Sequence, residues 1–135
     1  MKKIIDGTNA ILGRLASYVA KEALKGNDVA VLNCEKIIIT GNKKNIEKNF
    51  LAKRSRVGSS QKGPKHSVSS EKIVKRTIRG MLPDHRFGRG KEILRKIMCY
   101  NGTPKEFQNT KMIKAGKEKA SKFITIKDIS KWLKK

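Results

Sequence analysis

The chain has 135 residues, of which 37% are hydrophobic and 33% are charged. This length is enough for one domain with a real core and too short for two. There are 33 Lys and Arg residues against 11 Asp and Glu, so the formal net charge is +22. A small soluble domain usually carries a net charge of roughly 2–8. Repulsion between so many cations disfavours a compact free protein and predicts a polyanionic partner.

Nucleic acid is the leading candidate for this partner, and an anionic membrane surface is the second. No apolar run approaches the length of about 18 residues that a membrane-spanning helix needs. Asp6, Thr8 and Asn9 interrupt the start of the chain, where a signal peptide would be apolar. Cys34 and Cys99 could form one disulfide, but two free thiols in an intracellular protein are the commoner arrangement. We therefore expect a cytoplasmic protein with no membrane partner.

The first forty residues predict a strand, a helix and two further strands. Short apolar runs at residues 3–6, 29–32 and 37–40 are typical of buried strands. Between the first two runs, apolar residues recur every three to four positions from Ile11 to Leu24, which indicates an amphipathic helix. A strand, a helix and a strand in this order predict a βαβ unit, and hence a parallel sheet with helices on its faces.

Gly13 is unusual inside this predicted helix, where it costs about 1 kcal/mol relative to Ala. Two explanations are open. Another part of the protein packs closely against Gly13, which we expect, or an RNA strand approaches the helix at Gly13 and Arg14.

The middle of the chain combines a predicted helix with a long irregular stretch. A helix is expected over residues 42–53, and hydrophobic periodicity is then lost from Arg54 to Ser70, where Gly, Ser and Pro mix with positive charge. A loop of this length is uncommon inside a compact domain unless it is functional or disordered. We expect it to be disordered in the free protein and to become ordered on a polyanion.

A basic segment, KRTIRGMLPDHRFGRGK, extends from Lys75 to Lys91. Its first half continues a helix that Ser69 or Ser70 caps and Pro83 ends, and a glycine-rich turn follows. Guanidinium groups suit phosphate oxygens because two N–H donors can bind at once. The segment therefore predicts one side that packs on the domain and another that binds a polyanion.

The last third of the chain has a weaker pattern. Residues 91–96 predict a short helix and residues 97–100 a strand, after which residues 105–122 are rich in lysine. Thr125 and Asp128 resemble a capping box that begins a terminal helix. We expect one α/β domain over residues 1–104, with a basic loop at 54–70, and a basic C-terminal extension over 105–135.

The sequence contains no catalytic constellation. His66 and His85 stand apart in basic polar stretches, without Cys or carboxylates at metal-ligand spacing. We interpret each as a surface histidine or the neighbour of a phosphate. The acids are scattered, and the glycines form neither GxGxxG nor a P-loop. We expect no enzymatic activity, no cofactor and no metal.

The composition also bears on how nucleic acid would be bound. Aromatic residues make up only 5% of the chain, and no RNP-type aromatic motif is present. Stacking on single strands is therefore not expected to be the main mode of binding. Contacts to phosphates and recognition of the shape of folded RNA fit the sequence better.

Four motifs resemble one family, the large-subunit ribosomal protein family thirteen. They are Ile11-Leu-Gly-Arg-Leu-Ala-Ser17, Asn33-Cys-Glu-Lys36, Arg79-Gly-Met-Leu-Pro83 with Arg89-Gly90, and Tyr100-Asn-Gly-Thr-Pro104. Gly63-Pro64 and the terminal helix at 125–133 are similar to the archaeal and eukaryotic members. The resemblance covers the chain from Ile5 to about Pro104.

The resemblance implies a three-layer α/β/α fold with a small, mostly parallel sheet of about four strands. It also implies a structural, non-enzymatic constituent of the large ribosomal subunit, which binds large-subunit rRNA, lies beside other ribosomal proteins and supports assembly. The resemblance and the charge pattern together predict a set of rRNA-binding residues. They are Arg14, Lys53, Arg54, Arg56, Lys62, Lys65, Arg76, Arg79, Arg86, Arg89 and Lys91.

The alternative from charge alone is a basic regulatory or compacting protein that binds DNA or RNA outside the ribosome. Helix-turn-helix or zinc-finger spacing would favour the DNA version, and the sequence has neither.

Overall fold

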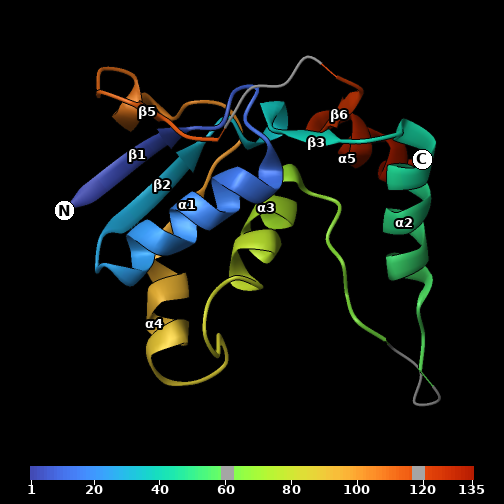
Figure 1. Cartoon of the computed structure of the whole chain (residues 1–135), viewed down its shortest axis with the longest axis horizontal. Helices are drawn as coiled ribbons and strands as arrows, with labels where there is room; N and C mark the ends of the chain where they lie inside the picture. The colour runs from blue at the N-terminus through green and yellow to red at the C-terminus, as the bar shows by residue number, and fades with distance from the viewer. Residues whose placement is uncertain (59–62, 117–120) are drawn as a thin grey trace.

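Four parallel strands form the main sheet of the computed structural model, which describes residues 1–58, 63–116 and 121–135 (Figure 1). In order across the sheet they are β4 (Ile97–Cys99), β2 (Asp28–Leu32), β1 (Lys2–Asp6) and β5 (Ile113–Lys114). β1 and β2 pair in parallel along their whole length, from Lys2 opposite Asp28 to Asp6 opposite Leu32. The predicted parallel sheet and its βαβ unit are confirmed.

Alternating side chains of these strands supply the two faces of the sheet. Ile5, Val29 and Val31 belong to the larger core, and Ala30 and Leu32 belong to a smaller core on the opposite side. This separation follows from the two-residue period of a strand, which places neighbouring side chains on opposite faces.

Helices cover one face of the sheet and a short turn covers the other, which confirms the three-layer α/β fold. α1 (Leu12–Leu24), α3 (Ser70–Arg79) and α4 (Gly88–Lys96) lie together on the first face (Figure 1). The 3-10 helix η2 (Lys105–Phe107) covers the second face through buried Phe107. The second layer is thin, because one aromatic side chain supplies most of its apolar cover.

A smaller antiparallel sheet lies beside the main one. β3 (Ile38–Thr40) pairs with β6 (Phe123–Thr125), and α2 (Lys43–Ser55) and α5 (Ile126–Lys134) lie next to it (Figure 1). η1 (Cys34–Lys36) leads from β2 into β3. The run at 37–40 is therefore a strand, as predicted, but it lies outside the parallel sheet.

The helix boundaries agree with the predicted caps at two positions. The Thr125 hydroxyl accepts a hydrogen bond from the Asp128 backbone N–H at 3.3 Å, as predicted for the start of α5. α3 begins after Ser69, as predicted, but the Ser69 side chain makes no capping hydrogen bond, and the helix ends at Arg79 with Gly80 as its C-cap, before Pro83. The Thr125 hydrogen bond satisfies an N-terminal N–H of α5, and a cap of this kind stabilises a helix by about 1 kcal/mol.

The carboxyl ends of β1 and β2 are closed by hydrogen bonds between their own side chains. One Asp6 carboxylate oxygen accepts from the Thr8 N–H, the Thr8 hydroxyl and the Asn33 amide at 3.1, 2.8 and 2.9 Å. Burial alone would raise the pKa of Asp6, but these hydrogen bonds outweigh it and lower the pKa. Open α/β sheets usually bind ligands at this edge. Here the polar groups already have partners within the chain.

Cys34 and Cys99 are free thiols, as predicted; Cys34 is buried and Cys99 half-buried. A hydrogen bond with the Cys99 thiol, together with burial, raises the pKa of Cys34. Within residues 1–58, 63–116 and 121–135, no helix is long and apolar enough to cross a membrane. The same residues contain no group of three or more His, Cys, Asp or Glu side chains that could hold a metal ion.

Candidate nucleic-acid interface

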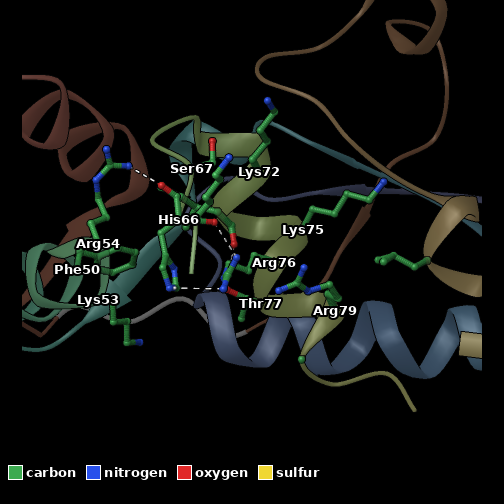
Figure 2. A pocket seen from close by; sticks show the side chains of 14 residues that line it. Phe50, Lys53, Arg54, His66, Ser67, Lys72, Lys75, Arg76, Thr77 and Arg79 are labelled. Atoms are coloured by element: carbon green, nitrogen blue, oxygen red, sulfur yellow. Dashed lines mark hydrogen bonds between the residues drawn. The ribbon is translucent and has the colours of Figure 1, made fainter. Parts of the chain in front are cut away.

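An open groove of about 580 Å³ lies between the end of α2, residues 65–67 and α3 (Figure 2). Seven of the side chains that line it are cationic, and none of the described lining residues is acidic. The seven are Lys53, Arg54, Lys65, Lys72, Lys75, Arg76 and Arg79. We call this feature the basic groove.

The amphipathic character of α3 explains one wall of the basic groove. α3 buries Ile73, Val74 and Ile78 in the main core. Because side chains three and four positions apart share one face of a helix, the intervening Lys and Arg residues face away from the core. Lys72, Lys75, Arg76 and Arg79 therefore line the groove together.

Two arginines attach Lys65 and His66, in the segment between α2 and α3, to these helices. Arg54 on α2 donates to the His66 carbonyl at 2.5 Å, and Arg76 on α3 donates to the Lys65 carbonyl at 3.1 Å (Figure 2). A guanidinium carries five N–H donors, so each arginine keeps donors for another ligand. These contacts place Lys65 and His66 between the two helices.

His66 lies among the cations of the groove. Its Nε2 is 3.4 Å from Arg76 Nη2. Burial and the nearby charges of Arg76, Lys53, Arg54 and Arg56 lower the pKa of His66. A lowered pKa favours the neutral imidazole, because a further positive charge would be repelled. The field around His66 is therefore strongly positive and suits an anion.

Among the described residues, none of the groove cations has an acidic partner. In the described part of the chain, the ion pairs are Lys3–Glu22, Lys25–Glu22 and Lys43–Glu47. None of them involves a residue of the groove. Burial and the neighbouring charge of Arg79 lower the pKa of Arg76, in agreement with uncompensated repulsion there.

The basic groove contains one aromatic side chain, Phe50, which is half-buried against the main core. The Lys53 ammonium lies 6.0 Å from the centre of its ring. Phe50 thus connects this part of α2 to the main core.

The structure brings together five of the predicted binding residues. Lys53, Arg54, Lys65, Arg76 and Arg79 line the basic groove. Arg14, Arg56, Arg86 and Lys91 are exposed but do not line it. Lys62 lies outside the described residues, as does part of the 54–70 stretch expected to be disordered in the free protein. For every residue of the predicted set, inside or outside the groove, binding to RNA stays a prediction.

Arg89 has a partner inside the chain. Its Nη2 donates to the Leu24 carbonyl at 2.8 Å. Leu24 is the last residue of α1, where carbonyl groups lack intrahelical partners. Arg89 therefore holds the start of α4 to the end of α1.

Gly13 is not explained by packing within the protein. It is exposed in the first turn of α1, and apart from its chain neighbours and the backbone of its own helix, no described atom lies within 4 Å of the position that a Cβ would occupy. Our expectation of close packing was therefore wrong for the described residues. The other explanation, approach of a nucleic-acid strand at Gly13 and Arg14, stays a prediction.

Our predicted set of binding residues did not include Lys72, Lys75 or His66, whose side chains can carry positive charge in the groove. Lys72 and Lys75 lie on the polar face of α3, and the helical period from Lys72 to Arg79 was the signal that could have added them. His66 was predicted to be either a surface residue or the neighbour of a phosphate. No local pattern could place it against Arg76, because that contact depends on the path of residues 63–67.

The side chains of the groove are suited to binding phosphates. Its groups are hydrogen-bond donors with positive charge, which suit phosphate oxygens.

Comparison with known proteins gives the family of the chain. The family model described as "Ribosomal protein L13" matches residues 1–106. The chain belongs to this family. A Thermoplasma acidophilum relative, "Large ribosomal subunit protein uL13", is 39% identical over 134 residues, covering 97% of each chain. The similarity to this L13 relative therefore continues beyond residue 106.

Two further L13 relatives carry the same name. The Methanopyrus kandleri protein is 47% identical over 102 residues, covering 76% of this chain and 63% of its own. The Caenorhabditis elegans protein is 45% identical over 115 residues, covering 83% of this chain and 56% of its own. The predicted likeness to archaeal and eukaryotic members is confirmed.

Proposed function

We propose that the chain is a structural constituent of the large ribosomal subunit and binds large-subunit rRNA through the basic groove. The strongest support is the concentration of seven cations in one groove whose described lining residues include no acid. Membership of the L13 family and the printed names of the relatives support the ribosomal setting.

The mechanism is phosphate binding with release of counterions. Each phosphate that a Lys or Arg neutralises frees condensed ions into solution, so affinity falls as salt rises. Lys53, Lys65, Lys72, Lys75 and Arg79 supply the charge in the groove. Arg54 and Arg76 have a second task, since their hydrogen bonds to carbonyl groups fix the segment that carries Lys65.

Binding also relieves the repulsion within the protein. The formal charge of +22 opposes a compact free chain, and rRNA phosphates neutralise part of it. This coupling explains how the protein supports assembly without enzymatic activity: the rRNA stabilises the protein and the protein fixes the rRNA backbone. Neighbouring large-subunit proteins are the further partners that this setting implies, in a cytoplasmic ribosome.

Co-sedimentation of the tagged full chain with ribosomal particles tests the proposal. We expect the protein to sediment with large subunits at physiological salt and to be released progressively as the salt concentration rises, because its phosphate contacts weaken with salt. Recovery with chromosomal DNA in place of the large subunit would contradict the ribosomal role. That result would favour a regulatory or compacting protein outside the ribosome.

A further inference from the structure

Phe87 is the most exposed aromatic side chain of the protein. It is 71% exposed, in the loop between α3 and α4. The next most exposed aromatic, Phe123, is 46% exposed, and the others are half-buried or buried. Exposing a whole phenyl ring forfeits the stabilisation that its burial would bring. Phe87 is therefore placed where it does little for this fold.

The loop that carries Phe87 is held in place at several points. A Cβ at Gly90 would lie 1.7 Å from the Pro83 carbonyl oxygen, so only glycine allows this close approach. Arg89 donates to the Leu24 carbonyl at the end of α1. The exposure of Phe87 thus belongs to a defined loop conformation, and a ligand would meet a preorganised ring.

Cations outnumber acids around Phe87, where the neighbouring sequence contains Arg86, Arg89 and Lys91 against Asp84 and Glu92. Arg86 precedes Phe87, and Lys91 is exposed in the first turn of the helix that follows. Figure 1 shows this loop extending away from the sheet on the same side as the end of α2, which lines the basic groove. An apolar protein partner would have to cover these cations, whereas RNA would neutralise them.

We infer that Phe87 is a stacking platform for one unpaired base of the bound rRNA, with Arg86 and Lys91 beside the neighbouring phosphates. The inference rests on the proposed rRNA binding. Stacking suits the site because every base offers an aromatic face, and unpaired nucleotides of folded RNA can turn outward. The low aromatic content of the chain fits a single contact of this kind.

Affinity of the full chain for the organism's own purified large-subunit rRNA tests the inference. We expect Phe87→Ala to weaken binding about tenfold, which is within the range of base–aromatic stacking. The salt dependence should stay the same, because no charge is removed. Phe87→Trp should bind like the wild type, and Phe87→Leu should be as weak as Phe87→Ala. Phe123→Ala is the matched control and should leave the affinity unchanged.

Two results would overturn the stacking role. One is binding by Phe87→Ala within about twofold of the wild type; the other is full affinity in Phe87→Leu, which would indicate a non-aromatic contact. Because Phe87 is exposed, thermal unfolding of each variant should match the wild type and exclude a folding defect. If the wild-type chain itself does not prefer this rRNA to competitor DNA, the proposed function fails as well.

Crosslinking supplies an independent readout of the same contact. Short-wavelength ultraviolet light should join Phe87 to a nucleotide in the complex with large-subunit rRNA, and mass spectrometry would locate the adduct. A crosslink pattern from which the Phe87 peptide is absent, with other peptides crosslinked, would count against stacking.

Discussion

Two regions of the molecule use positive charge in opposite ways. At the end of α1, the Glu22 carboxylate accepts hydrogen bonds from Lys3, from Lys25 at 2.9 Å and from Asn27 at 3.1 Å. In the basic groove, seven cations share one open surface with no acid among the described lining residues. The first arrangement satisfies its charges inside the chain, and the second leaves them available to a partner.

This difference separates stability from binding. Glu22 is buried, and its ion pairs join β1, α1 and the turn after α1. Removing the carboxylate leaves cations without a partner next to the core, which is costly. Removing a groove cation reduces repulsion in the free protein and weakens contact with phosphate. Substitutions in the two regions should therefore affect different measurements.

Glu22→Gln should have the largest effect on stability. The hydrogen bonds from Lys3 and Lys25 lower the pKa of Glu22 to about 2. The carboxylate therefore stabilises the fold at pH values above its ordinary pKa, and this contribution is lost as the pH falls toward 2. We expect Glu22→Gln to lower the thermal midpoint by several degrees at pH 7. At acidic pH, the midpoint of this variant should fall less steeply with pH than that of the wild type.

The control for Glu22 is Glu47→Gln. Glu47 pairs with exposed Lys43 on one helix at 4.0 Å. Such pairs contribute about 0.3–0.5 kcal/mol. Equal shifts of the midpoint in the Glu22 and Glu47 variants would show that the Glu22 cluster has no special role in folding.

Arg89→Ala should have a smaller effect, on the free energy of unfolding. The substitution removes the hydrogen bond to the Leu24 carbonyl, which we expect to cost about 1 kcal/mol in urea unfolding. Arg86→Ala is the control, because Arg86 is exposed in the same loop and its change should stay within about 0.5 kcal/mol. Equal stability of the two variants would contradict the structural role of Arg89.

His66 should give the smallest effect, a change in the pH dependence of rRNA binding. Its pKa is lowered in the free protein, so its contribution to stability is present above pH 6.5 and is lost as the pH falls through the folded pKa. Phosphates in the groove should raise this pKa, so binding takes up a proton. We expect affinity to rise severalfold as the pH falls from about 7 to about 5.5.

His66→Gln removes the titrating group and provides the comparison for this prediction. The affinity of this variant should depend less on pH than that of the wild type. If both proteins show the same pH dependence, His66 does not take up the proton.

Much of the main fold could be predicted because local patterns suffice for its first half. The runs at 3–6 and 29–32 and the helix between them follow from short apolar runs and helical periodicity. β5 could not be predicted in this way, because it has only two residues in a lysine-rich stretch. It joins the sheet through backbone pairing with Ile5 and Asp6, to which side-chain periodicity gives no clue.

The binding surface could be predicted in composition but not in arrangement. Arg76, Arg79 and Arg89 look alike in the sequence. In the structure, Arg76 and Arg79 line the groove, whereas Arg89 donates a hydrogen bond to the Leu24 carbonyl. Those differences arise from contacts between residues far apart in the chain. Charge patterns alone contain no information about which cations already have partners.

Salt dependence of rRNA binding tests the central claim most directly. The double variant Lys65→Gln, Arg79→Gln removes two groove cations that have no acidic partner in the described part of the chain. The control Lys25→Gln, Lys43→Gln removes two cations that pair with Glu22 and Glu47. Plots of log affinity against log salt should become shallower by about 1.8 for the groove variant, or 0.9 for each lost phosphate contact, and stay unchanged for the control. Equal slopes for both variants would contradict the claim that the unpaired groove cations bind the rRNA.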